Sequence, residues 1–331
     1  MKAMLLEQYG PEPVFAERDL PMPEPGPGEV LIKVAGTSLN PIDNKIATLG
    51  SALAFAPDAP AVLGMDVSGT VAGVGEGVTR LAEGDPVFGC AGGVRGIPGA
   101  LAEYMVADQH LLAAPPECMD LADAATLPLV SITAWLALFN KGGLRRGERL
   151  LVHGGAGGVG HMAVQLGVHA GAEVYATVSS PDKAAVVEAL GGIPIDYRET
   201  PVAEYVADCT GGEGFDLVFD TVGGPTLDAS FEGARIDGRV VSTVTRSTHD
   251  LSLMHAKSLS LHVVFMLLPL ITGKGRGLHG RILADVAGLV DDDRLAVLLD
   301  ERSFGFREIA EAHRYWQRGE AMGKIAVSVS G

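Results

Sequence analysis

Three glycines stand at a spacing that suits a phosphate-binding turn. Gly155, Gly157 and Gly160 form the pattern GxGxxG, directly after the apolar run 149–153 and at the start of a stretch with helical periodicity. The pattern allows a tight turn, close approach of the backbone to a pyrophosphate and close packing of helix on strand. The free N–H groups at the start of a helix also favour an anion. An ordinary glycine turn is the alternative in a chain with 44 glycines, but the flanking strand and helix favour a dinucleotide site.

The next expected strand, 173–178, ends in residues that suit a second phosphate. Ser179 and Ser180 follow it directly, and Lys183 comes one helical turn later. A carboxylate at this point would accept a hydrogen bond from the 2′-hydroxyl of NAD and repel the 2′-phosphate of NADP. Asp182 is the one acid close by, and the first turn of a helix is its ordinary place. The segment therefore favours NADPH over NADH, with a solvated surface lysine as the alternative for Lys183.

The order of the expected elements indicates two domains. From residue 124 onward, strands alternate with helices, which is typical of a doubly wound parallel sheet. These strands are expected at 150–153, 173–178, 193–196, 215–220, 239–244 and 260–266, and the helices at 158–169, 182–190, 202–209 and 226–233. Short strands separated by Pro- and Gly-rich turns come before them, at 1–6, 29–35, 65–74, 85–90 and 102–107, and indicate a largely antiparallel or barrel-like β domain.

The end of the chain departs from the strand–helix alternation. Helical patterns at 280–289 and 307–318, followed by an apolar run at 324–329, are expected to return to the first domain. The β-rich domain would then be discontinuous, comprising residues 1–123 and 268–331. The nucleotide-binding domain at 124–267 would be inserted into it.

Composition disfavours several classes of partner. There are 25 Lys and Arg residues against 41 Asp and Glu, a formal net charge of −16 that repels nucleic acid and anionic lipid. Cys90, Cys118 and Cys209 are too scattered for a disulfide framework or a Cys-x-x-Cys metal site, so a cytoplasmic protein is expected. The N-terminus lacks the pattern of a signal peptide, and no apolar run is expected to span a membrane. The longest, 261–271, suggests a buried strand or a sheet edge shared in a homodimer.

A set of motifs along the whole chain resembles one known superfamily. They are Pro25–Val34 (PGPGEVLIKV), Leu39–Asp43 (LNPID), Gly64–Gly69 (GMDVSG), Leu127–Pro128, Thr133–Trp135 (TAW), the glycine loop, Asp196–Arg198 (DYR), Asp220–Gly224 (DTVGG) and Gly323–Ile325 (GKI). With these motifs the chain resembles the medium-chain dehydrogenase/reductase superfamily, and within it the zinc-independent quinone oxidoreductase group related to zeta-crystallin. The resemblance implies an α/β protein with a GroES-like β-rich domain and a Rossmann domain, and an active site in the cleft between them.

The resemblance also implies that a catalytic zinc is missing. Alcohol dehydrogenases of the superfamily place a cysteine near the position of Asn40 and a His–Glu pair where Met65 and Asp66 stand, and neither Asn40 nor Met65 can replace those ligands. Their four-cysteine structural zinc loop is missing as well. We therefore predict no metal site, although Asp43, Asp66 and Cys90 could in principle assemble one. Their ordinary roles would be a turn residue, a packing residue and a small buried hydrophobe.

Without a metal to polarise an alcohol or a simple carbonyl, the expected acceptors are already electrophilic. They are quinones and conjugated enones or enals, which would take hydride from the nicotinamide and a proton from water or a hydroxyl. Two alternatives stay open. One is a zinc-type alcohol dehydrogenase, and the other is a protein that binds NADPH without turnover, as among the crystallin relatives.

The resemblance assigns two residues to the nicotinamide and the substrate. Asn40 matches the family's asparagine, and Thr133 matches the residue that lies beside the nicotinamide. The alternatives are a cap for the turn after Asn40 and an ordinary buried helical threonine. No tyrosine lies in 45–55, where several family members carry one, so a tyrosine proton donor is not expected. His153 and His161 flank the glycine loop without an evident base partner and are expected to be structural.

The other residues carried over from the family are expected to bind NADPH. On the adenine and phosphate side they are Ala156, Gly157, Gly158, Val159, Ser179, Lys183 and Tyr197. Val222 and Thr243 close the fourth and fifth strands, at the edge where cofactors lie in open α/β sheets. Phe265 ends the sixth strand and is expected to line the nicotinamide and substrate pocket. Lys324 belongs to the family's C-terminal Gly-Lys, with a strand cap as its alternative role.

Overall fold

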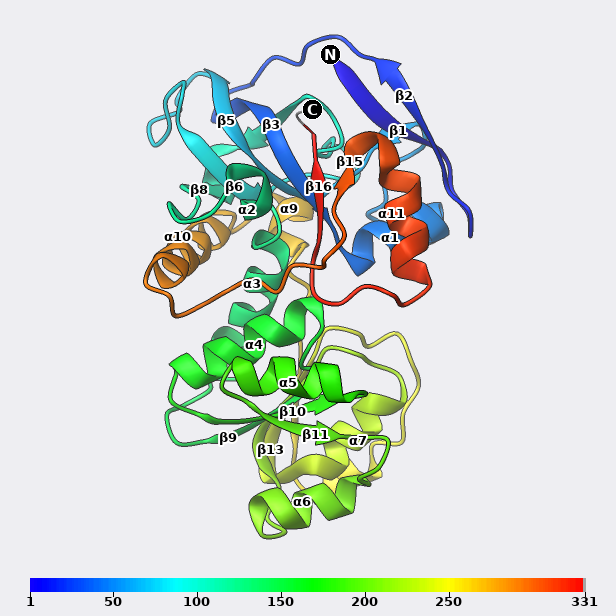
Figure 1. The fold of residues 1–331 in the computed structure, drawn as a ribbon, viewed down its shortest axis with the longest axis vertical. Coiled ribbons are helices and arrows are strands. Elements are labelled where there is room, and N and C mark those ends of the chain that lie inside the picture. The colour runs from blue at the N-terminus through cyan, green and yellow to red at the C-terminus, as the bar shows by residue number, and fades with distance from the viewer. Residues whose placement is uncertain (330–331) are drawn as a thin grey trace. The chain divides into compact units, whose positions relative to one another are not determined.

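The computed structural model describes residues 1–329 and divides the chain into two units (Figure 1). The first unit comprises Met1–Ile132, Leu267–Asp293 and Val297–Gly331. The second unit comprises Thr133–Met266 and Arg294–Ala296. The first unit contains two β-sheets and the second unit contains one.

The unit boundaries differ from the predicted 124–267 at three places, one of which is the single residue Leu267, assigned to the first unit. The contacts explain the other two. Residues 124–132 belong to the first unit, because α2 (Leu121–Ala124) packs on its strands and the N–H of Leu129 donates to Asp66 Oδ1 at 2.9 Å. Residues 294–296 belong to the second unit. Gln165 holds Ala296 there with two reciprocal hydrogen bonds, Nε2 to O at 2.8 Å and N to Oε1 at 2.8 Å. These contacts join residues far apart in the sequence, which periodicity does not show.

The second unit is built on a six-stranded parallel sheet of order β11-β10-β9-β12-β13-β14. Its strands are β9 (Arg149–His153), β10 (Glu173–Val178), β11 (Ile193–Asp196), β12 (Phe215–Asp220), β13 (Ala234–Ser242) and β14 (Ser260–Val263). The predicted doubly wound parallel sheet is confirmed. The expected strand at 239–244 begins earlier, at Ala234, because pairing of Ala234 with Phe215 extends it through the turn-like Asp237-Gly238.

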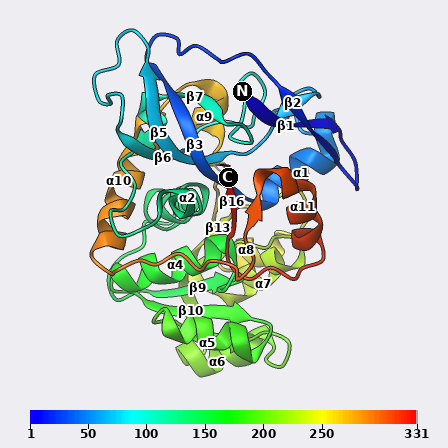
Figure 2. The same cartoon turned by 45° about the horizontal axis from the view of Figure 1, so that its top comes forward.

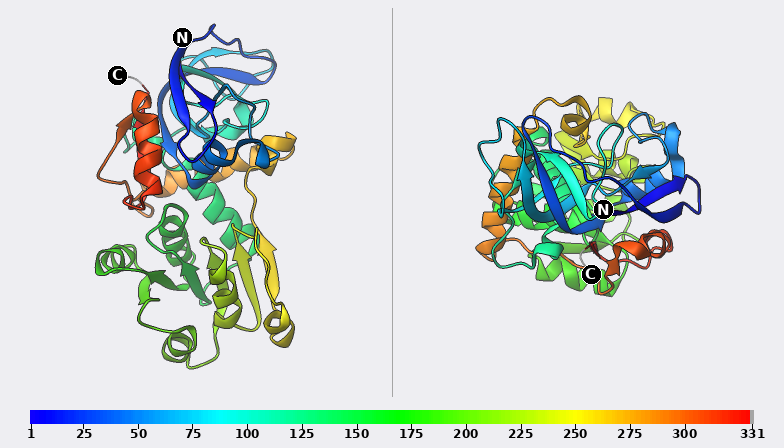
Figure 3. Two further views of the ribbon diagram at one scale, coloured as in Figure 1. Left: turned by 90° about the vertical axis from the view of Figure 1, so that its right-hand side faces the viewer. Right: turned by 90° about the horizontal axis from the view of Figure 1, so that it is seen from above.

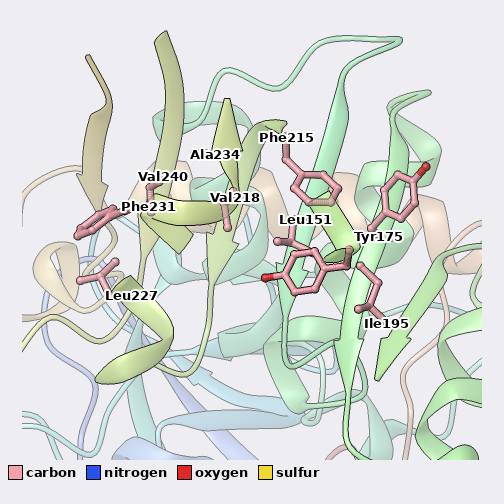
Figure 4. Packing of buried hydrophobic residues seen from close by; sticks show 10 residues of the cluster. Leu151, Tyr175, Ile195, Phe215, Val218, Leu227, Phe231, Ala234 and Val240 are labelled. Carbon is pink, nitrogen blue, oxygen red and sulfur yellow. The ribbon is translucent and has the colours of Figure 1, made fainter. Parts of the chain in front are cut away.

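Helices cover both faces of this sheet. They are α4 (Gly158–His169), α5 (Pro181–Ala189), α6 (Val202–Thr210), α7 (Pro225–Gly233) and the unpredicted α8 (Ser252–Ala256). Side chains alternate between the faces along each strand. Leu151 belongs to the core cluster of Figure 4, which includes residues of α6 and α7. Leu150 and Val174 instead pack so closely on α4 that a Cβ on Gly167 would lie 2.7 and 2.9 Å from them. The helix periods in the sequence therefore predicted four of the five helices to within one residue at each end.

The first unit is largely antiparallel, as expected. Among residues 1–329 it contains a three-stranded sheet of order β2-β1-β4 and a seven-stranded sheet of order β15-β16-β3-β5-β6-β8, with β7 pairing on β3. The strands are β1 (Lys2–Gln8), β2 (Val14–Asp19), β3 (Glu29–Leu39), β4 (Ala61–Val62), β5 (Asp66–Val74), β6 (Pro86–Cys90), β7 (Tyr104–Asp108), β8 (Leu112–Ala113), β15 (Phe304–Gly305) and β16 (Ile325–Ser328). The unpredicted strands are short or half-exposed ones (β2, β4, β8 and β15), which carry little periodic signal.

The last part of the chain returns to the first unit. Strand β16 pairs antiparallel with β3, the red and blue strands of Figure 1. Helix α10 (Gly277–Asp291) contacts β6 and β8, and α11 (Ile309–Gln317) packs near β2. Figure 2 shows α10 beside β6. The unit also contains α1 (Pro41–Leu49) and α9 (Leu268–Thr272), and α3 (Pro128–Trp135) begins in it. The expectation that the chain end rejoins the β-rich part therefore agrees with this pairing.

One helical segment corrects the expectation about membrane-length runs. Residues Leu121–Lys141, with a mean hydropathy of 1.6, are long and apolar enough to cross a membrane by length and composition. Of this apolar window, 72% is buried inside the protein. A helix surrounded by protein is apolar on all sides for that reason, so the segment has the character of a core helix.

Candidate functional site

The glycine loop of the second unit has the close packing that its pattern requires. It joins β9 to α4, with Gly157 as the N-cap and a hydrogen bond from Gly157 N to Gly154 O at 3.0 Å. A Cβ on Gly155 would lie 2.5 Å from Ala176 Cβ, and one on Gly160 would lie 2.0 Å from Gly154 O. A Cβ on Gly157 would meet only Gly154 O, at 3.2 Å. Two glycines therefore allow the chain to pack, and the third leaves the backbone at the helix start open to a pyrophosphate.

The loop is fixed from below by the neighbouring strand β10. Gly154 N donates to Thr177 Oγ1 at 3.0 Å, and Gly155 N donates to Thr177 O at 3.0 Å. His153 is buried beside them, and burial lowers its pKa to about 4 in spite of nearby Asp220. The imidazole is therefore neutral at pH 7, in an environment that suits a structural role.

The ends of β12 and β13 are tied together by a carboxylate that the sequence did not single out. Asp220 Oδ1 accepts from the N–H groups of Val222 (2.9 Å) and Gly223 (2.8 Å), and Oδ2 accepts from Ser242 Oγ at 2.9 Å. Thr243 N also donates to Asp220 O at 3.1 Å. A fully buried acid at the end of an apolar strand was the available signal. Asp220 thus shapes the carboxyl edge that the predicted contacts Val222 and Thr243 occupy.

The residues proposed for the 2′-phosphate lie at the ends of adjacent strands. Ser180 is the N-cap of α5, with its Oγ accepting from Lys183 N at 3.4 Å. Lys183 Nζ donates to Ser179 Oγ at 3.3 Å, so its ammonium lies over the end of β10. Tyr197 N donates to Val178 O at 3.3 Å, and its side chain is 55% exposed. The parallel pairing of β10 with β11 therefore brings these residues to one edge of the sheet.

The other cofactor contacts predicted in this unit also lie along the carboxyl ends of the strands. Val222 follows β12 and is 53% exposed, and Thr243 follows β13. Phe265 comes two residues after β14 and is 39% exposed. Thr133 is buried in α3. Their contact with a cofactor stays a prediction.

A buried polar cluster in the first unit contains the other predicted site residues. We call Ser38, Asn40, Asp43, Asp66 and Lys324 the Asp66 cluster, and each is at most 3% exposed. Asp66 Oδ2 accepts from Asn40 Nδ2 and from Ser38 Oγ, both at 2.8 Å. Lys324 Nζ donates to Asn40 Oδ1 and to Leu39 O, and lies 3.7 Å from Asp66 Oδ2.

Burial dominates the electrostatics of this cluster. It raises the pKa of Asp66 and lowers that of Lys324, while the attraction between the two opposes both shifts. Burial, followed by the nearby Asp66, raises the pKa of Asp43 to about 7. Two acids and one ammonium form a neutral set when Asp43 holds its proton, which is the least costly arrangement away from water.

The cluster changes how two predicted residues are to be understood. Asn40 is the backbone N-cap of α1, but its side chain does not cap the helix; Asp43 Oδ2 instead accepts from Asn40 N at 3.0 Å. Lys324 precedes β16 and directs its ammonium into the cluster. The sequence did not reveal these hydrogen bonds. A contact of Lys324 with cofactor stays a prediction, and the structure adds a contact with Asn40.

Asp66 and Cys90, two of the residues considered for a metal, have other interactions in the structure. Both carboxylate oxygens of Asp66 accept hydrogen bonds, and burial raises the pKa of Cys90 well above that of an ordinary thiol. Within the described residues 1–329, no group of three or more His, Cys, Asp or Glu side chains could hold a metal ion.

The raised pKa of Asp43 predicts a pH dependence of stability. A folded-state pKa of about 7, against an ordinary value of 3.8, means that the folded protein binds more protons between these values. The stabilisation is complete below about pH 4 and is lost as the pH rises through 7. We expect wild type to lose about 2 kcal/mol of unfolding free energy between pH 5 and pH 7 from this group, and Asp43→Asn to remove that loss. Urea unfolding at pH 5, 6, 7 and 8 measures it.

Comparison with the variant is needed because other buried groups act in the opposite sense. Burial lowers the pKa of His279 and of His313 to about 4, so these groups stabilise the fold more as the pH rises. They are unchanged in Asp43→Asn and cancel in the difference. Parallel pH profiles for the two proteins would show that Asp43 does not titrate in this range.

Comparisons with known proteins agree with the fold. Residues 26–117 match the family model of the alcohol dehydrogenase GroES-like domain, and residues 192–327 match that of the zinc-binding dehydrogenase family. The curated 2-methylene-furan-3-one reductase of Solanum lycopersicum is 30% identical over 99% of this chain and 79% of its own length. The chain spans only 13% and 14% of the length of two polyketide synthase proteins that it also matches.

Solved structures cover the whole chain. An alcohol dehydrogenase superfamily protein from Novosphingobium aromaticivorans is 39% identical, with a TM-score of 0.95 and 100% of each chain covered. A mycobacterial quinone oxidoreductase is 28% identical, with a TM-score of 0.84 over 99% of this chain and 100% of that chain. A mycobacterial protein complexed with NADPH is 29% identical, with a TM-score of 0.86 and the same coverage. The chain is therefore a quinone oxidoreductase-like member of the medium-chain dehydrogenase/reductase superfamily of oxidoreductases.

Proposed function

We propose that the protein is an NADPH-dependent, zinc-independent reductase of quinones or of conjugated enones and enals. The observation that carries the proposal is the pairing of an open glycine loop with Lys183 and Ser179 at the end of the next strand. Such an arrangement has a place for a pyrophosphate and a cation for a 2′-phosphate. The proposal is also supported by a relative solved with NADPH and by one named for reducing a methylene-furanone, which is a conjugated enone.

The chain's own residues would bind and orient NADPH and polarise the acceptor. The N–H groups at the start of α4 would hold the pyrophosphate, and Lys183, Ser179 and Tyr197 would hold the 2′-phosphate. When bound, NADPH supplies the hydride. Thr133 remains the proposed neighbour of the nicotinamide.

Asn40 remains the proposed partner of the acceptor oxygen. Its Nδ2 uses one hydrogen for Asp66, which leaves a second N–H. Lys324 bonded to Oδ1 draws electron density away from the amide nitrogen and so strengthens that second N–H as a donor to a developing enolate or quinolate.

We further propose a cytoplasmic homodimer with no nucleic acid or membrane partner. Strand β14 lies at one edge of the parallel sheet, the yellow strand in the left view of Figure 3. Val263 at the end of this strand is 45% exposed. An exposed apolar strand edge favours pairing with a second copy.

The test is a panel of quinones, enones and enals with NADPH and NADH in parallel. We expect NADPH to be preferred, and Lys183→Gln to raise the KM for NADPH about 10- to 100-fold while leaving that for NADH unchanged. The size follows from loss of about 1.5–3 kcal/mol for one charge-assisted hydrogen bond. Steady-state loss of NADPH absorbance measures it.

Lys141→Gln is the matched control, because Lys141 is an exposed lysine of the same unit. A wild-type preference for NADH would contradict the 2′-phosphate site. Tight NADPH binding without oxidation by any acceptor would contradict the reductase and favour a binding protein.

A further inference from the structure

Outside the proposed cofactor site, three side chains of the second unit form a chain of hydrogen bonds. Ser247 Oγ lies 2.5 Å from His249 Nε2, and His249 Nδ1 lies 2.8 Å from Asp228 Oδ1. Asp228 is in the first turn of α7, and the other two are in the loop between β13 and α8. The order is therefore hydroxyl, imidazole, carboxylate, with each ring nitrogen facing a different partner.

This order is the one that activates a serine. A carboxylate facing Nδ1 keeps the hydrogen on that nitrogen, which leaves Nε2 as an acceptor for the hydroxyl proton. A hydroxyl within hydrogen-bond reach of such a nitrogen can lose its proton as it attacks a carbonyl carbon. The arrangement is recognised by geometry and can occur on unrelated folds.

The imidazole is held firmly, whereas the hydroxyl is accessible. The His249 side chain is 9% exposed and meets the ring of Phe231 edge-on, with centroids 6.4 Å apart and an interplanar angle of 83°. Phe231, labelled in Figure 4, belongs to the buried core between the sheet and α7. Ser247 is exposed. The base is thus anchored to the core while the nucleophile faces solvent.

Donors for a carbonyl oxygen lie next to the hydroxyl. Within residues 1–329, the backbone N–H groups of Ser247 and Thr248 donate to no protein acceptor. In serine hydrolases the N–H of the nucleophile or of the residue after it stabilises the oxyanion. These two groups are therefore available for the same purpose.

We propose that Ser247, His249 and Asp228 form a second catalytic site that hydrolyses small activated esters, such as aryl esters of short acids. Ser247 Oγ bonds to the carbonyl carbon while its proton passes to His249 Nε2. The aryl oxide leaves as the acyl–oxygen bond breaks and takes that proton. Water then attacks the acyl-serine and gives one proton to Nε2. As the acyl–Oγ bond breaks, that proton passes to Ser247 Oγ, which releases the carboxylic acid and restores the serine. An exposed serine suits small esters with good leaving groups, which need little binding energy.

The experiment uses the full chain with 4-nitrophenyl acetate and a fluorophosphonate probe. We expect hydrolysis that falls about 100-fold or more in Ser247→Ala and in His249→Gln, the usual range for a general base. Asp228→Asn is expected to slow it less. Mass spectrometry should find the phosphonyl group on the peptide that contains Ser247.

Thr245→Ala is the matched control, since Thr245 is an exposed hydroxyl residue of the same loop that has no part in the proposed site. NADPH binding and thermal unfolding show whether each variant is folded. Equal ester hydrolysis in wild type and Ser247→Ala, or a probe attached elsewhere, would overturn the proposal. Neither result depends on whether the chain reduces quinones.

Discussion

Lys324→Met is expected to lower the free energy of unfolding by about 3–5 kcal/mol, the usual cost of leaving a buried charge without its partner. Asp66 is fully buried and lies 3.7 Å from the Lys324 ammonium. Without that cation, the carboxylate must stay charged in an apolar environment or take up a proton that its hydrogen-bond donors do not favour. The same change removes the donor to Asn40 Oδ1. Urea unfolding, followed by hydrogen exchange in β3 and β16, measures the loss and locates it.

Two further variants separate charge from packing. Lys324→Met combined with Asp66→Asn removes both charges and is expected to recover much of the loss, because no uncompensated charge remains. Lys33→Met changes an exposed lysine of the same sheet and is expected to alter stability by no more than about 0.5 kcal/mol. If the double variant were no more stable than the single one, the ammonium would not be what compensates Asp66.

The parts of the fold that could be predicted were those with a repeating local signal. The strands 173–178, 193–196 and 215–220 and the helix 158–169 were predicted at their observed bounds, because apolar runs and the helical period are strong there. The strand at Ala61–Val62 has only two residues and is defined by pairing with Leu5 and Leu6. Such a strand depends on a distant partner, so the sequence alone does not reveal it.

The candidate site shows the same limit. The glycine loop and the Ser179–Lys183 segment are local patterns, and the structure gives them the expected strand–loop–helix context. The Asp66 cluster includes a hydrogen bond between Asn40 and Lys324, which are 284 positions apart. Its polar residues lie in or beside apolar strands, which was a signal that something must satisfy them, but it did not identify the partner.

Gly157→Ala is expected to weaken NADPH binding about 100-fold or more while changing the thermal stability little. The φ of Gly157 is −80°, which any residue adopts, and a Cβ there would lie 3.2 Å from one backbone oxygen, a contact relieved by a small shift. The same Cβ would stand at the start of α4, where the backbone must approach the pyrophosphate closely. A displacement of about 1 Å at such a contact is enough for an effect of this size. Fluorescence titration with NADPH gives the affinity, and calorimetry gives the unfolding temperature.

Two other glycines show whether the effect belongs to the cofactor or to the fold. Gly160→Ala puts a Cβ 2.0 Å from Gly154 O, so the loop itself must move, and both stability and affinity are expected to fall. Gly233→Ala places a Cβ at ordinary contact distances, 3.5 Å or more, in the same unit, and neither quantity is expected to fall. Unchanged NADPH affinity in Gly157→Ala would mean that the dinucleotide does not cross the start of α4. A large loss of stability in that variant would mean that Gly157, like Gly160, is required for packing and gives no evidence of a ligand.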